Sequence, residues 1–179
     1  QAEADASASM LRRQVRIDPT ELGRVEFSWR VASLIAGADL TDREASDSPA
    51  RLALAFGGDA TRLPERTRVM FDLAQALTGE APPYATLMYV WDNKVACETV
   101  IHSRRSDRIR KIVVESGGAN TGAWRHYRRD IVADYRRTFG EAPGPLIGVG
   151  LMTDADNTGT RASALYGEVR LVATDGRRL

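Results

Sequence analysis

The sequence predicts a mainly β fold: a two-sheet antiparallel sandwich of the jelly-roll type with two short helices. The clearest sign is a strict two-residue alternation over 25–31, where Val25, Phe27, Trp29 and Val31 alternate with polar residues. Successive side chains of a strand point to opposite faces, so this pattern predicts a sheet with one buried and one solvated face. Strands outnumber helices and no strand–helix–strand alternation repeats, which favours a sandwich over an α/β fold.

The individual elements follow from local patterns. The segment 84–91 is apolar on both faces, which predicts a central strand. A helix is predicted over 64–77 and is stopped by Gly79; a second begins at about 124 or 130 and ends before Gly140. The remaining strands are predicted at 1–17 (one long strand or two short ones), 24–31, 50–56, 98–103, 108–116, 145–153 and 161–173.

Length and charge set the class of protein. The 179 residues fit a single domain, 1–179, and no apolar run is long enough to cross a bilayer. Twenty-five basic and 24 acidic residues give a net charge of +1, so no overall field attracts nucleic acid. Basic residues gather at 104–111 and 125–137, but without interleaved aromatic residues, so we interpret both as solvated faces and expect no nucleic-acid partner.

The sequence argues against several kinds of chemistry. Cys97 is the only cysteine, which excludes an internal disulfide and a thiolate metal cluster. His102 and His126 are the only histidines, and for each we favour a structural role over a catalytic one. The sequence has no glycine-rich phosphate loop, serine nucleophile elbow or dinucleotide fingerprint.

The sharpest motif is an acidic loop at 154–159. Asp154, Asp156 and Asn157 place two carboxylates and an amide oxygen within four residues, followed by Gly159. Calcium prefers several oxygen ligands, and a tight acidic loop can supply them. Asp, Asn and Gly are also the natural residues of a turn between strands. The sequence therefore leaves open a plain turn or a calcium site, and the two are compatible.

A second motif closes the apolar strand. Trp91 and Asp92 would emerge at a sheet edge, where an aromatic ring beside polar groups could grip a sugar. A core tryptophan followed by a turn is the structural alternative. Glu115 alternates with Val113 and so could point inward, with Arg128 or Arg129 as an ion-pair partner.

Resemblance to a known family covers most of the chain. The blocks that carry it are Asp47-Ser48-Pro49-Ala50-Arg51, Tyr89-Val90-Trp91-Asp92, Val113-Val114-Glu115-Ser116-Gly117, Asp134-Tyr135-Arg136-Arg137 with Phe139-Gly140-Glu141, and 152–159 with Tyr166-Gly167. In these blocks the chain resembles an uncharacterised bacterial family, domain of unknown function 3047. The resemblance implies a periplasmic or secreted protein with a segment upstream of Gln1, and it implies no activity. A weaker, fold-level likeness is to jelly-roll carbohydrate-binding modules.

We therefore expect an exported, non-catalytic domain that binds a glycan or another extracellular ligand. The expected ligand contacts are Trp91, Asp92, Glu115 and Arg51, and the expected calcium ligands are Asp154, Asp156 and Asn157. One alternative is a polysaccharide hydrolase that uses a carboxylate pair such as Glu115 and Asp92. Another is a structural subunit that docks by an open sheet edge.

Overall fold

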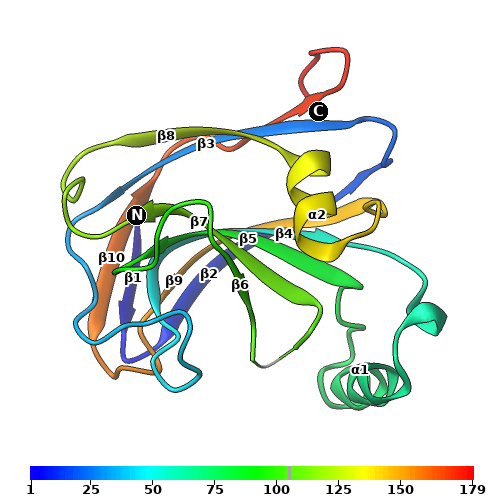
Figure 1. The fold of residues 1–179 in the computed structure, drawn as a ribbon, viewed down its shortest axis with the longest axis horizontal. Helices are drawn as coiled ribbons and strands as arrows, with labels where there is room; N and C mark the ends of the chain where they lie inside the picture. Colours follow the sequence, from blue (N-terminus) through cyan, green and yellow to red (C-terminus); the bar gives the residue numbers. More distant parts are fainter. Residues whose placement is uncertain (105) are drawn as a thin grey trace.

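The protein is a two-sheet β-sandwich, seen here in a computed structural model that describes residues 1–104 and 106–179 (Figure 1). Arg105, part of the basic run at 104–111, lies outside the described residues. One sheet runs in the order β1-β10-β3-β11, with β8 also paired to β3, and the other in the order β2-β9-β4-β5-β7-β6. The predicted fold class, mainly β with two packed sheets and two α-helices, is confirmed.

The first sheet is built around β3, the strand whose alternation is clearest in the sequence. β8 pairs with β3 over Arg24–Trp29, so β10 and β11 both lie along its opposite edge. Gly167 lies where the backbone turns between β10 and β11 and donates its N–H to Ser28 O (2.9 Å). The bounds in this sheet are Ala2–Asp5 (β1), Leu22–Val31 (β3), Arg125–Asp130 (β8), Arg161–Tyr166 (β10) and Arg170–Ala173 (β11).

The second sheet contains β4 and β5, in which most residues are buried. Its pairs are antiparallel except for β5 and β7, which run parallel, so the sheet is mixed. The chain leaves β5, forms the short edge strand β6 and returns through β7, which explains how a parallel pair arises without a crossover helix. The bounds are Ala8–Ile17 (β2), Ser48–Phe56 (β4), Ala85–Asp92 (β5), Val100–His102 (β6), Ile109–Ser116 (β7) and Leu146–Asp154 (β9).

The core lies between the inner faces of the two sheets. Trp29 and Phe27 of β3 face Tyr89 and Trp91 of β5, and Phe27 stacks on Tyr89 with ring centroids 5.6 Å apart. Helix α2 (Ile131–Phe139) contributes buried Tyr135, whose ring meets Phe56 edge to face. Alternation thus places the apolar set of each strand in one contiguous core.

The two helices differ in how they are held. Helix α2 begins at Asp130, whose side chain accepts a hydrogen bond from Ala133 N, and ends at Gly140 in the left-handed conformation. Helix α1 (Glu65–Thr78) follows a short 3₁₀ turn (Ala60–Arg62), stands apart from both sheets in Figure 1 and buries none of its residues. Its apolar stripe, including Leu73 and Leu77, is more than half exposed. Neither described helix is both long and apolar enough to span a membrane.

One predicted strand is divided in the structure, and two alternatives that the sequence left open are decided. The segment 161–173, predicted as one strand, is divided into β10 and β11. Residues 125–130 form strand β8, where a helix beginning at 124 was one of the two alternatives; Asp130 is the helix cap instead. The segment 1–17 forms two strands, one in each sheet, joined at Ala6, which adopts a positive φ of 45°.

Candidate functional site

Trp91 is a core residue. Its side chain is 0% exposed between the sheets, and its indole Nε1 donates a hydrogen bond to Gly117 O (3.0 Å). A ring without an exposed face cannot stack on a sugar. The structure therefore places Trp91 where it stabilises the sandwich, which is the alternative that the sequence left open.

Asp92 holds the turn after β5 and the loop that follows β3. Its carboxylate accepts hydrogen bonds from the backbone N–H groups of Lys94 (2.8 Å), Val95 (2.7 Å) and Leu40 (3.2 Å). The side chain is buried and its acceptor positions are used by the backbone. Asp92 therefore fixes the path of the loop over 32–47, which covers part of the outer face of the second sheet.

Glu115 points inward as predicted, but not because it shares a face with Val113. Val113 packs with Val90 on the outer face, and a shift in the β5–β7 register pairs Glu115 with inward-facing Trp91. Its ion-pair partner also differs from the predicted one. Its carboxylate accepts hydrogen bonds from Asn120 Nδ2 (3.0 Å), Arg125 Nε (2.8 Å) and Tyr127 Oη (2.8 Å). Burial alone would raise the pKa of Glu115, yet these three donors together lower it. The expectation of Arg128 or Arg129 as the partner is wrong, because strand β8 turns Arg125 toward Glu115 while Arg129 pairs with Glu98 and Asp134.

The loop over 32–47 carries one ion pair whose pH dependence can be measured. Lys94 Nζ lies 2.8 Å from Asp39 Oδ2, and this hydrogen bond, with those from Thr41, lowers the pKa of Asp39 to about 2. A lowered pKa stabilises the fold above pH 3.8, and this contribution is lost as the pH falls through about 2. We expect Lys94→Met to lower stability slightly at pH 6, because Lys94 is exposed, and the difference from wild type to shrink toward pH 2. Urea unfolding of both proteins across this range measures it, and a difference independent of pH would contradict it.

Arg51 occupies the outward face of β4, where it is only 5% exposed. Its guanidinium NH2 group lies 2.8 Å from Asp154 Oδ2 and donates to Ser46 O at 2.6 Å, while Nε has no hydrogen-bond partner among the described residues. Burial lowers the pKa of Arg51, and Asp154 and Asp47 oppose that shift. A buried arginine that keeps an unused donor is the type of group that recognises carboxylates and phosphates.

A small cavity of about 170 Å³, lined by both charged and apolar side chains, opens beside Arg51. Lys111 of β7 is also 5% exposed, and its ammonium donates to Ser46 Oγ (2.7 Å). Four basic side chains and two acidic ones line this cavity, and no aromatic side chain is among its described lining residues. We call it the Arg51 pocket; its lining includes Asp42, Arg43, Ser46, Arg51, Met88, Arg104, Lys111, Met152, Asp154 and Asn157.

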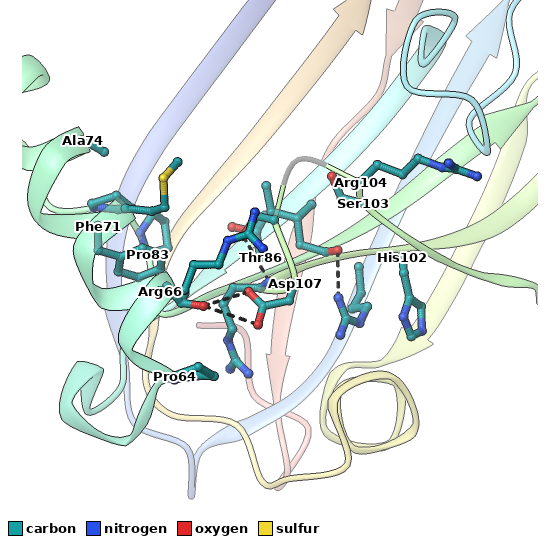
Figure 2. A pocket seen from close by; sticks show the side chains of 17 residues that line it. Pro64, Arg66, Phe71, Ala74, Pro83, Thr86, His102, Ser103, Arg104 and Asp107 are labelled. Carbon is teal, nitrogen blue, oxygen red and sulfur yellow. Dashed lines mark hydrogen bonds between the residues drawn. The ribbon is translucent and has the colours of Figure 1, made fainter.

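A larger groove of about 660 Å³ lies between helix α1 and the β6–β7 hairpin (Figure 2). One end of the groove is apolar, where Phe71 of α1 lies beside Pro83, whereas Arg66 of α1, Asp107 and His102 contribute polar groups. Thr67 Oγ1 lies 3.4 Å from Asp107 Oδ1 across the groove. We call this the α1 groove; its basic lining residues are Arg66, His102, Arg104, Arg108 and Arg110.

The Arg51 pocket and the α1 groove are neighbours on one surface track, because Ser103, Arg104 and Ile109 line both. Outward-facing residues of the paired strands β5 and β7 contribute to both hollows. Thr86 of β5 and Ile109 of β7 are paired in the groove, and two residues further along Met88 and Lys111 are paired in the pocket. The outer face of the second sheet therefore offers two neighbouring hollows in which basic side chains outnumber acidic ones.

An acidic cluster lies next to the Arg51 pocket. One carboxylate oxygen each from Asp47, Asp154 and Asp156 lie within 4.8 Å of one another. Asp47 comes from the loop before β4 and accepts hydrogen bonds from Thr158 N and Oγ1 (both 2.7 Å). Burial and the nearby Asp156 and Asp47 raise the pKa of Asp154 to about 6, although Arg51 opposes the shift.

Sequence reasoning found part of this surface. It identified Arg51, Asp154, Asp156 and Asn157, which the structure brings together, whereas Trp91, Asp92 and Glu115 are buried away from the pocket lining. It missed Asp47, Ser46 and Lys111. Lys111 carried a signal, because a lysine in the apolar strand 109–116 must have a polar neighbour. Asp47 gave no local sequence signal, because its hydrogen-bond partners lie 110 and 111 residues away in the chain.

Fold and surface together define a β-sandwich with a basic ligand-sized track on the outer face of one sheet. Comparison with family models places the chain within a known family. The chain belongs to the family of proteins of unknown function DUF3047, whose model matches residues 1–170. The resemblance noted in the sequence is thereby confirmed. No curated protein matches the chain.

Proposed function

We propose that this protein is an exported, non-catalytic domain that binds an acidic glycan along the outer face of its second sheet. The observation that carries the proposal is the pair of buried cationic side chains, Arg51 and Lys111, in one pocket. Arg51 contacts Asp154 and Lys111 contacts Ser46, and both also line the cavity, where the carboxylate of a sugar acid can accept charge-assisted hydrogen bonds from them. We assign the charged sugar unit to this pocket.

Further sugar units would lie in the α1 groove. A sugar ring presents an apolar C–H face and polar hydroxyl edges, and Phe71 and Pro83 supply apolar walls beside the polar groups of Arg66 and His102. The shared lining of pocket and groove allows one chain to occupy both. The aromatic platform expected at Trp91 is thereby replaced by a site on the opposite face of the same sheet, because Trp91 of β5 lies in the core and Met88 of β5 lines the pocket.

The test is calorimetric titration with a short oligogalacturonate and with its fully methyl-esterified counterpart of the same length. We expect binding of the acidic oligomer only, because the ester removes the charge that Arg51 and Lys111 recognise. Lys111→Met should weaken binding at least tenfold, since one charged hydrogen bond contributes about 1.5–3 kcal/mol. Arg161→Met on the other sheet is the control, as its ion pair with Asp5 is exposed.

Two results would overturn this proposal. Equal affinity for the acidic and esterified oligomers would show that charge is not recognised, and unchanged binding by Lys111→Met would place the ligand elsewhere. Phe71→Ala distinguishes binding in the pocket from binding in the groove. It should weaken binding of the oligomer and leave binding of the galacturonate monomer unchanged. We propose that the protein is exported because acidic polysaccharides of this kind lie outside the cytoplasm. Fractionation of native cells tests this location.

One observation favours hydrolysis as a second candidate. Asp154 and Asp156 bring carboxylate oxygens within 4.8 Å, and the raised pKa of Asp154 is that of a group able to act as an acid. The pair Glu115 and Asp92 is not suited to this role, since both are buried and fully engaged in hydrogen bonds with neighbours. Release of reducing ends from the same oligogalacturonate, lost in Asp156→Asn, would favour the hydrolase; none would favour binding alone.

A further inference from the structure

We propose that Asp47, Asp154 and Asp156 form a binding site for a divalent cation, calcium in preference to magnesium. Asp154 and Asp156 belong to the acidic loop of the sequence, whereas Asp47 comes from the distant loop that precedes β4. The site would therefore clamp two loops together at the rim of the Arg51 pocket.

The spacing of the three oxygens fits one calcium ion. Calcium binds oxygens at about 2.3–2.6 Å, so two oxygens on opposite sides of the ion lie roughly 4.6–5.2 Å apart, and adjacent ones lie closer. The three carboxylate oxygens, within 4.8 Å of one another, are inside this limit. Magnesium requires shorter distances and a stricter octahedron, which two loops of different origin are less able to supply.

An unused buried oxygen points independently to a ligand. Asp154 is only 5% exposed, and its Oδ2 is taken by Arg51, but its Oδ1 is buried with no hydrogen-bond partner among the described residues. A buried carboxylate oxygen without a partner is costly, because its hydration is lost and not replaced. A cation held between Asp154 and its two acidic neighbours would supply the missing interaction.

The local charges agree with a divalent ion. Three carboxylates carry three negative charges, and the guanidinium of Arg51 in contact with Asp154 supplies one positive charge. Carboxylate oxygens of this kind are the ligands that calcium prefers. Asp47 is fixed in position by Thr158 and by the backbone of Asn157, so the cluster is organised before the ion binds.

Calcium should also strengthen glycan binding, a consequence that rests on the proposed function. Asp154 and Arg51 both line the pocket and pair with each other. An ion that draws on the charge of Asp154 leaves more of the positive field of Arg51 to the glycan carboxylate. By linkage, the glycan should raise calcium affinity by the same factor.

The experiment is titration of chelator-stripped protein with calcium chloride, followed by calorimetry and by the melting temperature. We expect a dissociation constant of about 10⁻⁴–10⁻³ M, as in extracellular calcium modules, and a rise in melting temperature that chelator reverses. Asp156→Asn, at an exposed position, should weaken calcium at least tenfold without unfolding the protein. Asp175→Asn, exposed in the C-terminal segment, is the matched control and should change nothing.

The outcomes separate the cation site from the glycan site. No heat and no thermal shift with calcium, or equal affinity in Asp156→Asn and wild type, would overturn the cation site whatever the glycan does. Tighter binding of magnesium than calcium would overturn the choice of ion. Calcium binding with unchanged oligogalacturonate affinity would overturn the coupling alone, because the metal titration is done without glycan.

Discussion

Arg51→Met should lower the free energy of unfolding by about 3–5 kcal/mol, the cost of removing one partner of a buried ion pair. The side chains of Arg51 and Asp154 are 6% and 7% exposed, and their atoms meet at 2.8 Å. Without the guanidinium, Asp154 would be left in the interior beside Asp47 and Asp156, with no positive charge in direct contact. The lost hydrogen bond to Ser46 O would also loosen the loop before β4.

Denaturant unfolding measures this effect, with Arg161→Met as the control. The exposed pair of Arg161 with Asp5 should contribute little to stability, as is usual for solvent-exposed ion pairs. The double variant Arg51→Met/Asp154→Leu should recover most of the loss, because the buried charge disappears with its partner. A loss below about 1 kcal/mol for Arg51→Met would mean that the pair is solvated in solution. A double variant no more stable than the single one would attribute the loss to packing or to Ser46 instead.

The fold was predictable to the extent that each strand has one buried face. The alternation in β3 predicts one buried face, and the sequence of β5, apolar at both odd and even positions, predicts two. Both strands lie where those patterns predict. β8 was missed because its sequence, Arg125–Asp130, is polar on both sides: its inward Tyr127 is a single apolar side chain. A strand that contributes one large residue to the core gives too weak a period to recognise.

The parallel pairing of β5 and β7 could not be predicted for a different reason. Hydrophobic alternation specifies which face of a strand is buried but not the direction of its neighbour. That direction depends on β6, a three-residue strand whose pairing with β7 returns the chain. Short edge strands carry little pattern, so topology at this edge is decided by tertiary contacts.

In the site, too, residues that are close in sequence could be predicted to lie together, whereas residues that only the fold brings together could not. The acidic loop at 154–159 is local, and its residues do lie together beside Arg51. Asp47 and Lys111 join them only through the arrangement of β4, β7 and β9 in one sheet, which no local spacing encodes. Charged residues at outward positions of buried strands, Arg51 and Lys111, are the signal that would have narrowed the search.

Trp91→Ala tests the choice between core residue and ligand platform, and we expect it to destabilise the fold by about 3–5 kcal/mol. The indole is fully buried between the sheets, so its removal leaves a large cavity and an unpaired carbonyl at Gly117. A surface platform would behave in the opposite way, losing ligand affinity while keeping stability. Trp124→Ala is the control, since Trp124 is 43% exposed and should cost little.

The two readings of Trp91 separate most clearly when stability and binding are measured on the same variant. Trp91→Phe keeps most of the buried volume and should retain a folded protein at a smaller loss of stability. If the glycan binds on the outer face of the second sheet, folded Trp91→Phe should bind oligogalacturonate with wild-type affinity, because Arg51 and Lys111 point away from the core. Weakened binding by Trp91→Phe with unchanged stability would return the ligand site to the end of β5. The two faces of β5 thus have different roles: Tyr89 and Trp91 pack in the core, and Met88 on the opposite face lines the pocket.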